Sequence, residues 1–315
     1  MIIDMHCHLA PPKWAETRPM MRSLTDIEGF FREKEQAGVT LSVIGYGMMS
    51  RAGTQQQDLE FNMVREFEDF ALELVEKYPG RAVSFLGINP FGGRKMLYEA
   101  EKAVTQLGFK GIMVNSSIDG VYLDSPNATE FWELMGSLNV PVYLHQPALP
   151  SGGNGIQDFR LVRSVARWND VTMGLSAVIF AGILEKYPAL PLIGSLGGGG
   201  LAMLKDYLDI AYRRREIISE SVALPVDYLS DVPSTSLKQI YVDSCIPSSA
   251  VLAWNLSVFG SDHIVFSSDM PPSPISTAAA IQTIKDLPIG DEEKEKILWK
   301  NAAKLLKLEE ASAFS

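Results

Sequence analysis

Residues 3–8 read Ile-Asp-Met-His-Cys-His, a short apolar run that ends in two histidines with one residue between them. Side chains alternate between the two faces of a β-strand, so His6 and His8 are predicted to point to one side while Cys7 points away. Histidine is scarce here, with four in 315 residues. The stretch therefore predicts an opening strand with a chelating pair, which needs further ligands to make a metal site.

Short apolar runs alternate with longer helical patterns along the rest of the chain, which predicts parallel strands joined by crossover helices. About eight such units without a low-complexity linker favour one closed (β/α)8 barrel of the TIM type over residues 1–315, rather than an open doubly wound sheet. After the first strand, the predicted strands are 39–46, 82–88, 109–115, 140–145, 190–194, 239–243 and 264–268. The predicted helices are 25–36 with Thr25 as cap, 56–78, 95–106, 130–137, 158–168, 173–186, 201–218, 249–259 and 277–285.

The net charge and the two cysteines indicate which partners and which cellular compartment to expect. The net charge of −10 argues against nucleic acid or an anionic membrane as partner, because the phosphate field would repel this surface. The basic run Arg213–Arg215 is predicted to be a solvated helix face. Cys7 and Cys245 lie far apart without a secretory framework, and no stretch is long and apolar enough to span a bilayer. We expect a cytoplasmic enzyme with reduced cysteines.

In such a barrel, functional side chains gather where the strands end. The polar residues at those ends are His6, His8, Tyr46 with Arg51 beyond it, Asn89, Asn115, His145, Gln146, Ser195, Asp243 and Asp269. Taken by itself, His145 is explained as a core residue whose ring is hydrogen-bonded. Asp269 taken by itself is explained as a helix cap before two prolines. Together with His6 and His8 they supply three imidazoles and a carboxylate, a donor set that suits zinc or a related divalent ion and leaves one position for water. His263 precedes the last strand, at the opposite end, and is predicted to be structural.

Several spaced motifs support a family resemblance: residues 3–8, Gly108–Gly111, Val142–His145, Gly194–Gly198, Ser267–Pro271 and Asn301–Leu306. The chain resembles the amidohydrolase superfamily over nearly its whole length. The similar branch contains α-amino-β-carboxymuconate-ε-semialdehyde decarboxylase, γ-resorcylate decarboxylase and related hydratases and lactone hydrolases. The resemblance implies one metal ion held by His6, His8, His145 and Asp269, most simply zinc with manganese as the alternative, and it suggests a homodimer.

One position departs from that family. Where its members usually have a histidine that handles protons beside the metal, this chain has Ser195. A serine hydroxyl is a poor base near neutral pH, so it does not replace the imidazole. Two accounts stay open: Asp269 alone moves the proton, or Ser195 is a histidine-to-serine variant of an active site.

The leading expectation is a metal-dependent hydrolase that attacks a small cyclic or unsaturated acid, amide or lactone with hydroxide generated at the metal. The alternative is non-oxidative decarboxylation of a small aromatic or muconate-type acid, and a third possibility is a catalytically silent barrel that binds a ligand. Tyr46, Asn89, Asn115 and Gln146 are expected to orient the substrate. Arg51 is expected to hold its anionic group, because no matching arginine closely follows Ser195.

Overall fold

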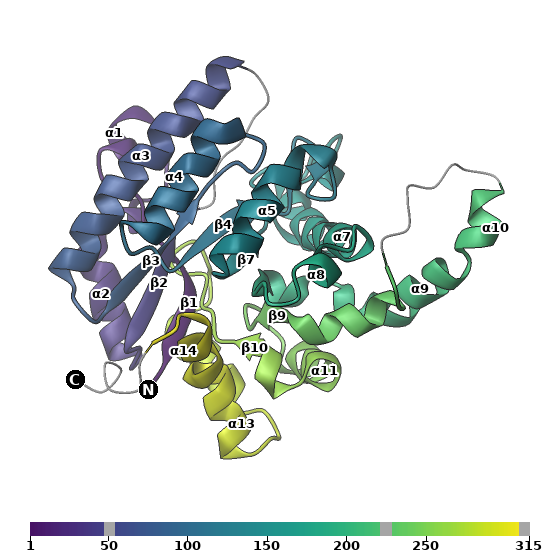
Figure 1. Cartoon of the computed structure of the whole chain (residues 1–315). Helices are drawn as coiled ribbons and strands as arrows, with labels where there is room; N and C mark the ends of the chain where they lie inside the picture. The colour runs from purple at the N-terminus through teal and green to yellow at the C-terminus, as the bar shows by residue number, and fades with distance from the viewer. Residues whose placement is uncertain (47–53, 221–228, 309–315) are drawn as a thin grey trace.

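The computed structural model describes residues 1–46, 54–220 and 229–308, without the side chains of residues 54–57. Eight parallel strands form one sheet in the order β1-β2-β3-β4-β7-β8-β9-β10 (Figure 1). Their bounds are β1 Ile3–His8, β2 Leu41–Gly45, β3 Ala82–Gly87, β4 Gly111–Asn115, β7 Val142–His145, β8 Leu192–Gly194, β9 Ile240–Asp243 and β10 Ile264–Val265. The prediction of a single (β/α)8 barrel is confirmed.

Helices surround the strands, and a short antiparallel hairpin of β5 (Ser117–Ile118) and β6 (Val121–Tyr122) follows β4. The helices are α1 Trp14–Thr17, α2 Ile27–Gln36, α3 Thr54–Lys77, α4 Gly93–Thr105, α5 Thr129–Leu138, α6 Phe159–Leu161, α7 Arg167–Phe180, α8 Ile183–Lys186, α9 Leu201–Arg213, α10 Arg215–Ser219, α11 Ser249–Phe259, α12 Thr277–Lys285, α13 Asp291–Glu295 and α14 Asn301–Leu305.

Several predicted element boundaries were wrong. The cap of α2 is Asp26 rather than Thr25, since the Asp26 carboxylate accepts from the N–H of Gly29 at 2.9 Å. The two helices predicted from 158 to 186 are continuous from α6 to α7 through a π-turn at Val162–Ala166. Asp170 lies within this run, and its buried carboxylate accepts hydrogen bonds from Ser116 and Ser117. The predicted helix 201–218 divides at Arg214.

The amino-terminal half of the barrel interior is filled with side chains. Inward-facing Ile3, Met5, Phe85 and Met113 belong to one buried apolar cluster, to which Leu305 of α14 also contributes. A packed interior at this end leaves the carboxyl-terminal ends of the strands as the place where a ligand can enter, as in other barrels of this type.

The barrel closes between β1 and the segment that follows β10. The last regular pairing ends at Val265, earlier than the predicted Ser268, yet the N–H of Met5 donates to Phe266 and that of His8 to Met270. A buried ion pair supports this seam: the Lys34 ammonium lies 2.8 Å from Asp4 and also 2.8 Å from the Ser268 hydroxyl. Burial lowers the pKa of Lys34, but the Asp4 charge and its other partners outweigh this and raise the pKa above the ordinary value.

Within the described residues, no helix has the length and the apolar character needed to cross a membrane.

The seam ion pair yields a stability prediction. Lys34→Met leaves the Asp4 carboxylate buried without its counter-charge, so we expect the free energy of unfolding to fall by about 3–5 kcal/mol. Urea denaturation followed by circular dichroism measures this change. The same substitution at exposed Lys238 is the control, and equal unfolding midpoints for the two variants would contradict the assigned role.

Candidate metal centre and its cavity

Four predicted ligands meet at the carboxyl-terminal ends of the strands. His6 and His8 come from β1, His145 from the end of β7, and Asp269 from the segment after β10. One ligand atom from each lies within 4.8 Å of every other, which places all four within reach of a single ion. The His6, His8 and His145 rings also stand edge to face, with centroids 4.5 to 5.1 Å apart.

An irregularity in β1 directs its side chains. The register with β2 shifts between Asp4 and Cys7. Met5 packs in the barrel interior and His6 also faces the interior, although strict alternation would send these neighbours to opposite faces. Asp4 points outward to Lys34 on α2. The bulge thus lets one strand both fill the core and present His6 and His8 to the site.

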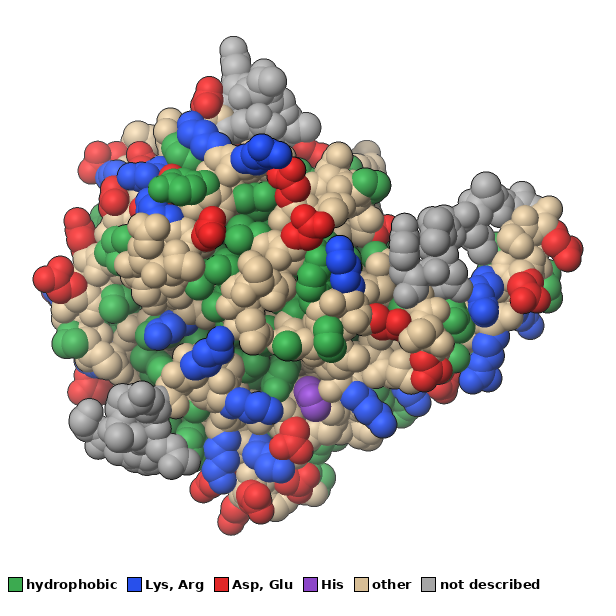
Figure 2. Space-filling view, viewed as in Figure 1, with side chains coloured by type: hydrophobic (Ala, Val, Ile, Leu, Met, Phe, Trp, Pro, Cys, Tyr) green, Lys and Arg blue, Asp and Glu red, His purple; other side chains and the backbone are tan. Residues whose placement is uncertain are grey.

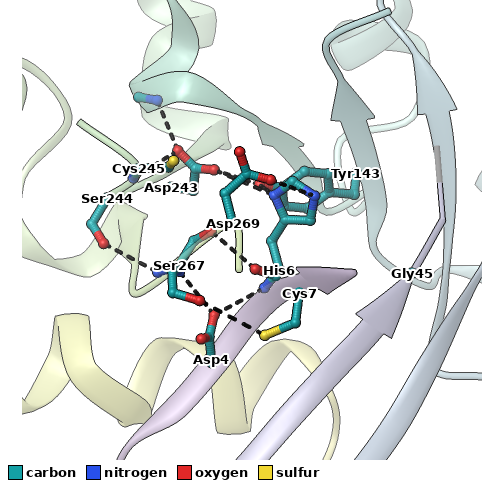
Figure 3. A network of polar contacts seen from close by, with 12 residues as sticks. Asp4, His6, Cys7, Gly45, Tyr143, Asp243, Ser244, Cys245, Ser267 and Asp269 are labelled. Atoms are coloured by element: carbon teal, nitrogen blue, oxygen red, sulfur yellow. Dashed lines mark hydrogen bonds and ion pairs between the residues drawn. The ribbon is translucent and has the colours of Figure 1, made fainter. Parts of the chain in front are cut away.

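A chain of hydrogen bonds fixes the orientation of the His6 ring (Figure 3). The Tyr143 hydroxyl donates its proton to Asp243 and lies 2.8 Å from Nδ1 of His6. The hydroxyl has only one proton, so it accepts from Nδ1–H, and the lone pair of His6 lies on Nε2. That Nε2 atom is buried without a hydrogen-bond partner.

Asp243 is the buried end of this chain. It also accepts from the N–H groups of Gly197 at 2.8 Å and Cys245 at 3.1 Å. Burial raises the pKa of Asp243 to about 6 in spite of these three donors. The sequence pattern placed Asp243 at a strand end but gave no sign that Tyr143 connects it to His6.

His8 is oriented by the main chain of β2. Its Nδ1 lies 3.1 Å from the carbonyl oxygen of Gly45, which only accepts, so Nδ1 is protonated. In the neutral ring Nε2 then carries a lone pair, and it lies 3.0 Å from a carboxylate oxygen of Asp269. A proton on Nε2 or a metal ion bound by both atoms would stabilise this contact.

His145 completes the test of whether a metal fits. Both of its ring nitrogens are buried without a hydrogen-bond partner. Burial, and then the charge of His8, lowers the pKa of both His6 and His145 well below the ordinary value, which keeps the imidazoles neutral. Neutral imidazoles with unpartnered nitrogens, facing a carboxylate, are the donor set that a divalent ion requires. The four residues therefore fit a metal ion.

Asp269 has an unusual backbone conformation. Its φ of 53° lies in the left-handed region, where aspartate is tolerated better than most residues. The N–H of Asp269 donates to the carbonyl of His6 at 3.0 Å, which ties the residue to β1. The local backbone therefore holds the carboxylate beside the histidines.

A cavity of about 210 Å³ is lined by three of the four ligands, His8, His145 and Asp269. Its lining includes three of the predicted substrate contacts, Tyr46, Asn115 and Gln146. Asn89 is not among the lining residues: its amide donates to Glu60 at 2.8 Å and its oxygen accepts from the N–H of Phe91. Arg51 lies outside the described residues.

Two arginines that the sequence analysis did not single out, Arg163 and Arg167, also line this cavity. They come from the π-turn and the start of α7. Their spacing of four residues on a helix was visible in the sequence, but the direction of that face was not.

Ser195 directly follows β8, fully buried, and its hydroxyl has no partner among the described residues. The glycines after it form a tight turn with positive φ angles at Gly197, Gly198 and Gly199. A side chain at Gly197 would lie 2.1 Å from Ile246, and the carbonyl of Gly197 accepts from Asn255. His263 packs against Tyr241 just before β10, away from the four ligands.

The hydrogen bond from His6 to Tyr143 predicts an effect on metal affinity. Tyr143→Phe keeps the ring but removes the hydroxyl that fixes the His6 tautomer, so we expect the affinity for a divalent ion to fall by about 10–100-fold. Competition with a chromophoric chelator measures the dissociation constant. Tyr241→Phe makes the same chemical change elsewhere in the barrel interior, and equal losses in both variants would refute a specific role for Tyr143.

Comparisons with known proteins agree with this architecture. The sequence profile of the amidohydrolase family matches residues 3–308. The γ-resorcylate decarboxylase of Polaromonas sp. (strain JS666) is 25% identical and the alignment covers 94% of this chain and 91% of that protein. The 2-amino-3-carboxymuconate-6-semialdehyde decarboxylase of Dictyostelium discoideum is 20% identical, over 98% and 92% of the two chains.

A solved structure shows the same fold. The dihydroxybenzoic acid decarboxylase of Polaromonas sp. JS666, with bound manganese and the inhibitor 2-nitroresorcinol, superposes with a TM-score of 0.79 at 23% identity, and the match covers 100% of this chain and 99% of that one. The chain belongs to the amidohydrolase family, in the branch of the γ-resorcylate and 2-amino-3-carboxymuconate-6-semialdehyde decarboxylases.

Proposed function

We propose that this protein is a metal-dependent, non-oxidative decarboxylase of a small aromatic or unsaturated carboxylic acid. The observation that carries the proposal is the cluster of His6, His8, His145 and Asp269, three of which line a cavity that Arg167 also lines. A cation site beside a guanidinium group suits a carboxylate ligand. The names of the relatives favour decarboxylation over the hydrolysis that was the leading expectation from sequence.

The size of the cavity supports a small substrate. At about 210 Å³ it is smaller than the roughly 300–1,000 Å³ typical of sites for drug-sized ligands. Three imidazoles and one carboxylate suit zinc, while the solved relative holds manganese, so these are the two ions to test. A divalent ion bound by the four residues would withdraw electron density from an oxygen of the substrate.

The side chains of the protein would position the acid and supply the proton. Tyr46, Asn115 and Gln146 line the cavity and would orient the ring. Asp269 would deliver a proton to the carbon that carries the carboxylate; the bond to that carboxylate then breaks, its electron pair stays with the ring, and CO2 leaves. One proton is consumed for each CO2 released, so the reaction needs no oxidant or reductant.

Ser195 is not assigned a role in proton transfer. Its hydroxyl is buried and unpartnered, and it is a poor acid or base near neutral pH. We therefore assign proton transfer to Asp269, which is partly accessible at the cavity wall.

The proposed role of Asp269 predicts a loss of turnover. Asp269→Asn removes the proton donor, so we expect the rate of CO2 release from 2,6-dihydroxybenzoate to fall by about 10²–10⁴-fold in protein with its metal content verified. Asp124→Asn, at an exposed site, serves as the control. Ring opening without CO2 would restore the hydrolase, no reaction across related acids would indicate a silent barrel, and faster turnover in Ser195→His would contradict proton transfer by Asp269 alone.

We further propose that two copies of this chain associate through α9, α10 and α11. The pair α9–α10 projects from the barrel (Figure 1), and its side chains Tyr207 and Ile217 are 70% and 66% exposed. An apolar groove of about 340 Å³ lies beside it, lined in part by Met203 and Trp254. Acidic and basic side chains are interspersed along this arm (Figure 2). With Asp206 near its start and arginines near its end, an antiparallel second copy would pair opposite charges.

This surface predicts the oligomeric state. Sedimentation velocity at micromolar concentration is expected to show a dimer, because an apolar surface of this extent is rarely left open to solvent. Tyr207→Glu is expected to give monomers, whereas Leu59→Glu, at an exposed apolar residue of α3, leaves the dimer intact. A monomeric unmodified protein would overturn the proposed dimer.

A further inference from the structure

The loop that follows β7 forms part of the cavity wall but is poorly packed near its glycines. Gln146 and Ala148 line the cavity, and the chain then turns through Ser151–Gly153 toward α6. A side chain built at Gly152 or Gly155 would meet nothing within 4 Å. Glycine loses more conformational freedom on ordering than any other residue, so this loop needs a contact from outside to stay in place.

The buried carboxylate of Asp170, on α7, supplies that contact. Its Oδ2 atom accepts from the N–H of Ser151 at 2.8 Å and from the Ser117 hydroxyl at 2.9 Å. The Ser151 hydroxyl donates in turn to the Ser117 hydroxyl at 3.1 Å, and Ser116 donates to Oδ1. Asp170 is only 2% exposed. Hydrogen bonds to a carboxylate are stronger than those between neutral groups, and burial strengthens them further, which makes Asp170 an anchor for the loop.

Asp170 joins three segments that each carry a residue of the cavity wall. Asn115 directly precedes the two serines that donate to the carboxylate. Ala148 lies three residues before Ser151, and Arg167 lies one helical turn before Asp170. Asp170 itself is not among the residues that line the cavity. Its carboxylate therefore fixes the wall from behind.

We infer that Asp170 is a positioning residue: it holds the loop after β7 in place and so shapes the cavity for a bound acid, without touching that acid or the metal. This inference rests on the proposed function for the class of ligand. A loop released from Asp170 visits more conformations, and a ligand then has to order it again, which weakens binding. Metal affinity is expected to stay the same, because the four ligands lie on β1, at the end of β7 and after β10.

Two substitutions at Ser151 separate its N–H from its hydroxyl. Ser151→Pro removes the N–H that donates to Asp170, whereas Ser151→Ala keeps it and removes only the hydroxyl. A proline fits there, because Ser151 begins a 3-10 turn and the preceding Pro150 is extended, with φ −69° and ψ 151°. A difference between the two variants therefore reports on the hydrogen bond from this N–H to Asp170.

One measurement follows the loop and two follow the site. Hydrogen exchange of the Gly153 and Ile156 amides, which bond within the loop, is expected to be about 10–100-fold faster in Ser151→Pro than in Ser151→Ala, the range for a hydrogen bond to a charged group. Calorimetric titration of 2,6-dihydroxybenzoate into manganese-loaded protein is expected to show affinity weaker by about 10–100-fold. The dissociation constants for manganese are expected to be equal, which a general loss of structure would not give.

Substitutions of Asp170 give a second comparison. Asp170→Asn keeps an oxygen that accepts from the N–H of Ser151, and its amide group can donate to the Ser116 hydroxyl, so the affinity for the acid is expected to be largely kept. Asp170→Leu removes both contacts and is expected to resemble Ser151→Pro. The two Ser151 variants decide the question if this buried substitution does not fold.

Two outcomes overturn the inference: equal affinities for the acid in Ser151→Pro and Ser151→Ala, or a loss of manganese affinity that matches the loss of acid affinity. Failure of the proposed function looks different. Binding without CO2 release, but with the expected difference between the Ser151 variants, would remove the decarboxylase and support the role of Asp170. If the unmodified protein binds no such acid, the proposed function falls, and equal exchange rates in the two variants would then overturn this inference as well, whereas faster exchange in Ser151→Pro would support it.

Discussion

The closure of the barrel between β1 and residues 266–270 is the constraint on which the site depends. His6 and His8 lie near the amino terminus and Asp269 lies in the carboxyl-terminal part of the chain. Only this seam brings them together. Backbone hydrogen bonds join the two segments, and the buried pair of Lys34 and Asp4, with the Ser268 hydroxyl, holds α2 against both. A buried pair of this kind contributes little net stability compared with apolar packing, but it permits few alternative arrangements. Its role here is to fix the seam rather than to strengthen the core.

Around that seam, burial determines the chemistry of the ligands. Withdrawal from water keeps His6 and His145 neutral, so their nitrogens are available to a cation. The same burial requires that each remaining polar atom have a partner, and Tyr143 and Gly45 supply those partners for His6 and His8. Nε2 of His6 and both nitrogens of His145 are left without partners. The unpartnered histidine nitrogens thus gather where a metal ion would satisfy them.

The charge distribution of the cavity is opposite to that of the whole protein. The chain carries a net charge of −10, yet the cavity collects two arginines beside a cation site. Overall charge therefore predicted which partners are excluded, but it carried no information about the ligand. Local geometry does, because the π-turn and α7 direct two arginines into a cavity where neither forms an ion pair with a carboxylate of the described residues.

The sequence alone determined the alternation of strands and helices, and hence the barrel, because each strand and helix has its own hydrophobic period. It also determined the ligand set, since His6, His8, His145 and Asp269 all follow apolar strands whose ends must meet in a barrel. Only the tertiary structure decided the bulge in β1, the link from Asp243 through Tyr143 to His6, and the direction of Arg163 and Arg167. These features depend on contacts between residues far apart in the chain, or on one extra residue in a helical turn. Such features do not change the hydrophobic periodicity from which the elements were predicted.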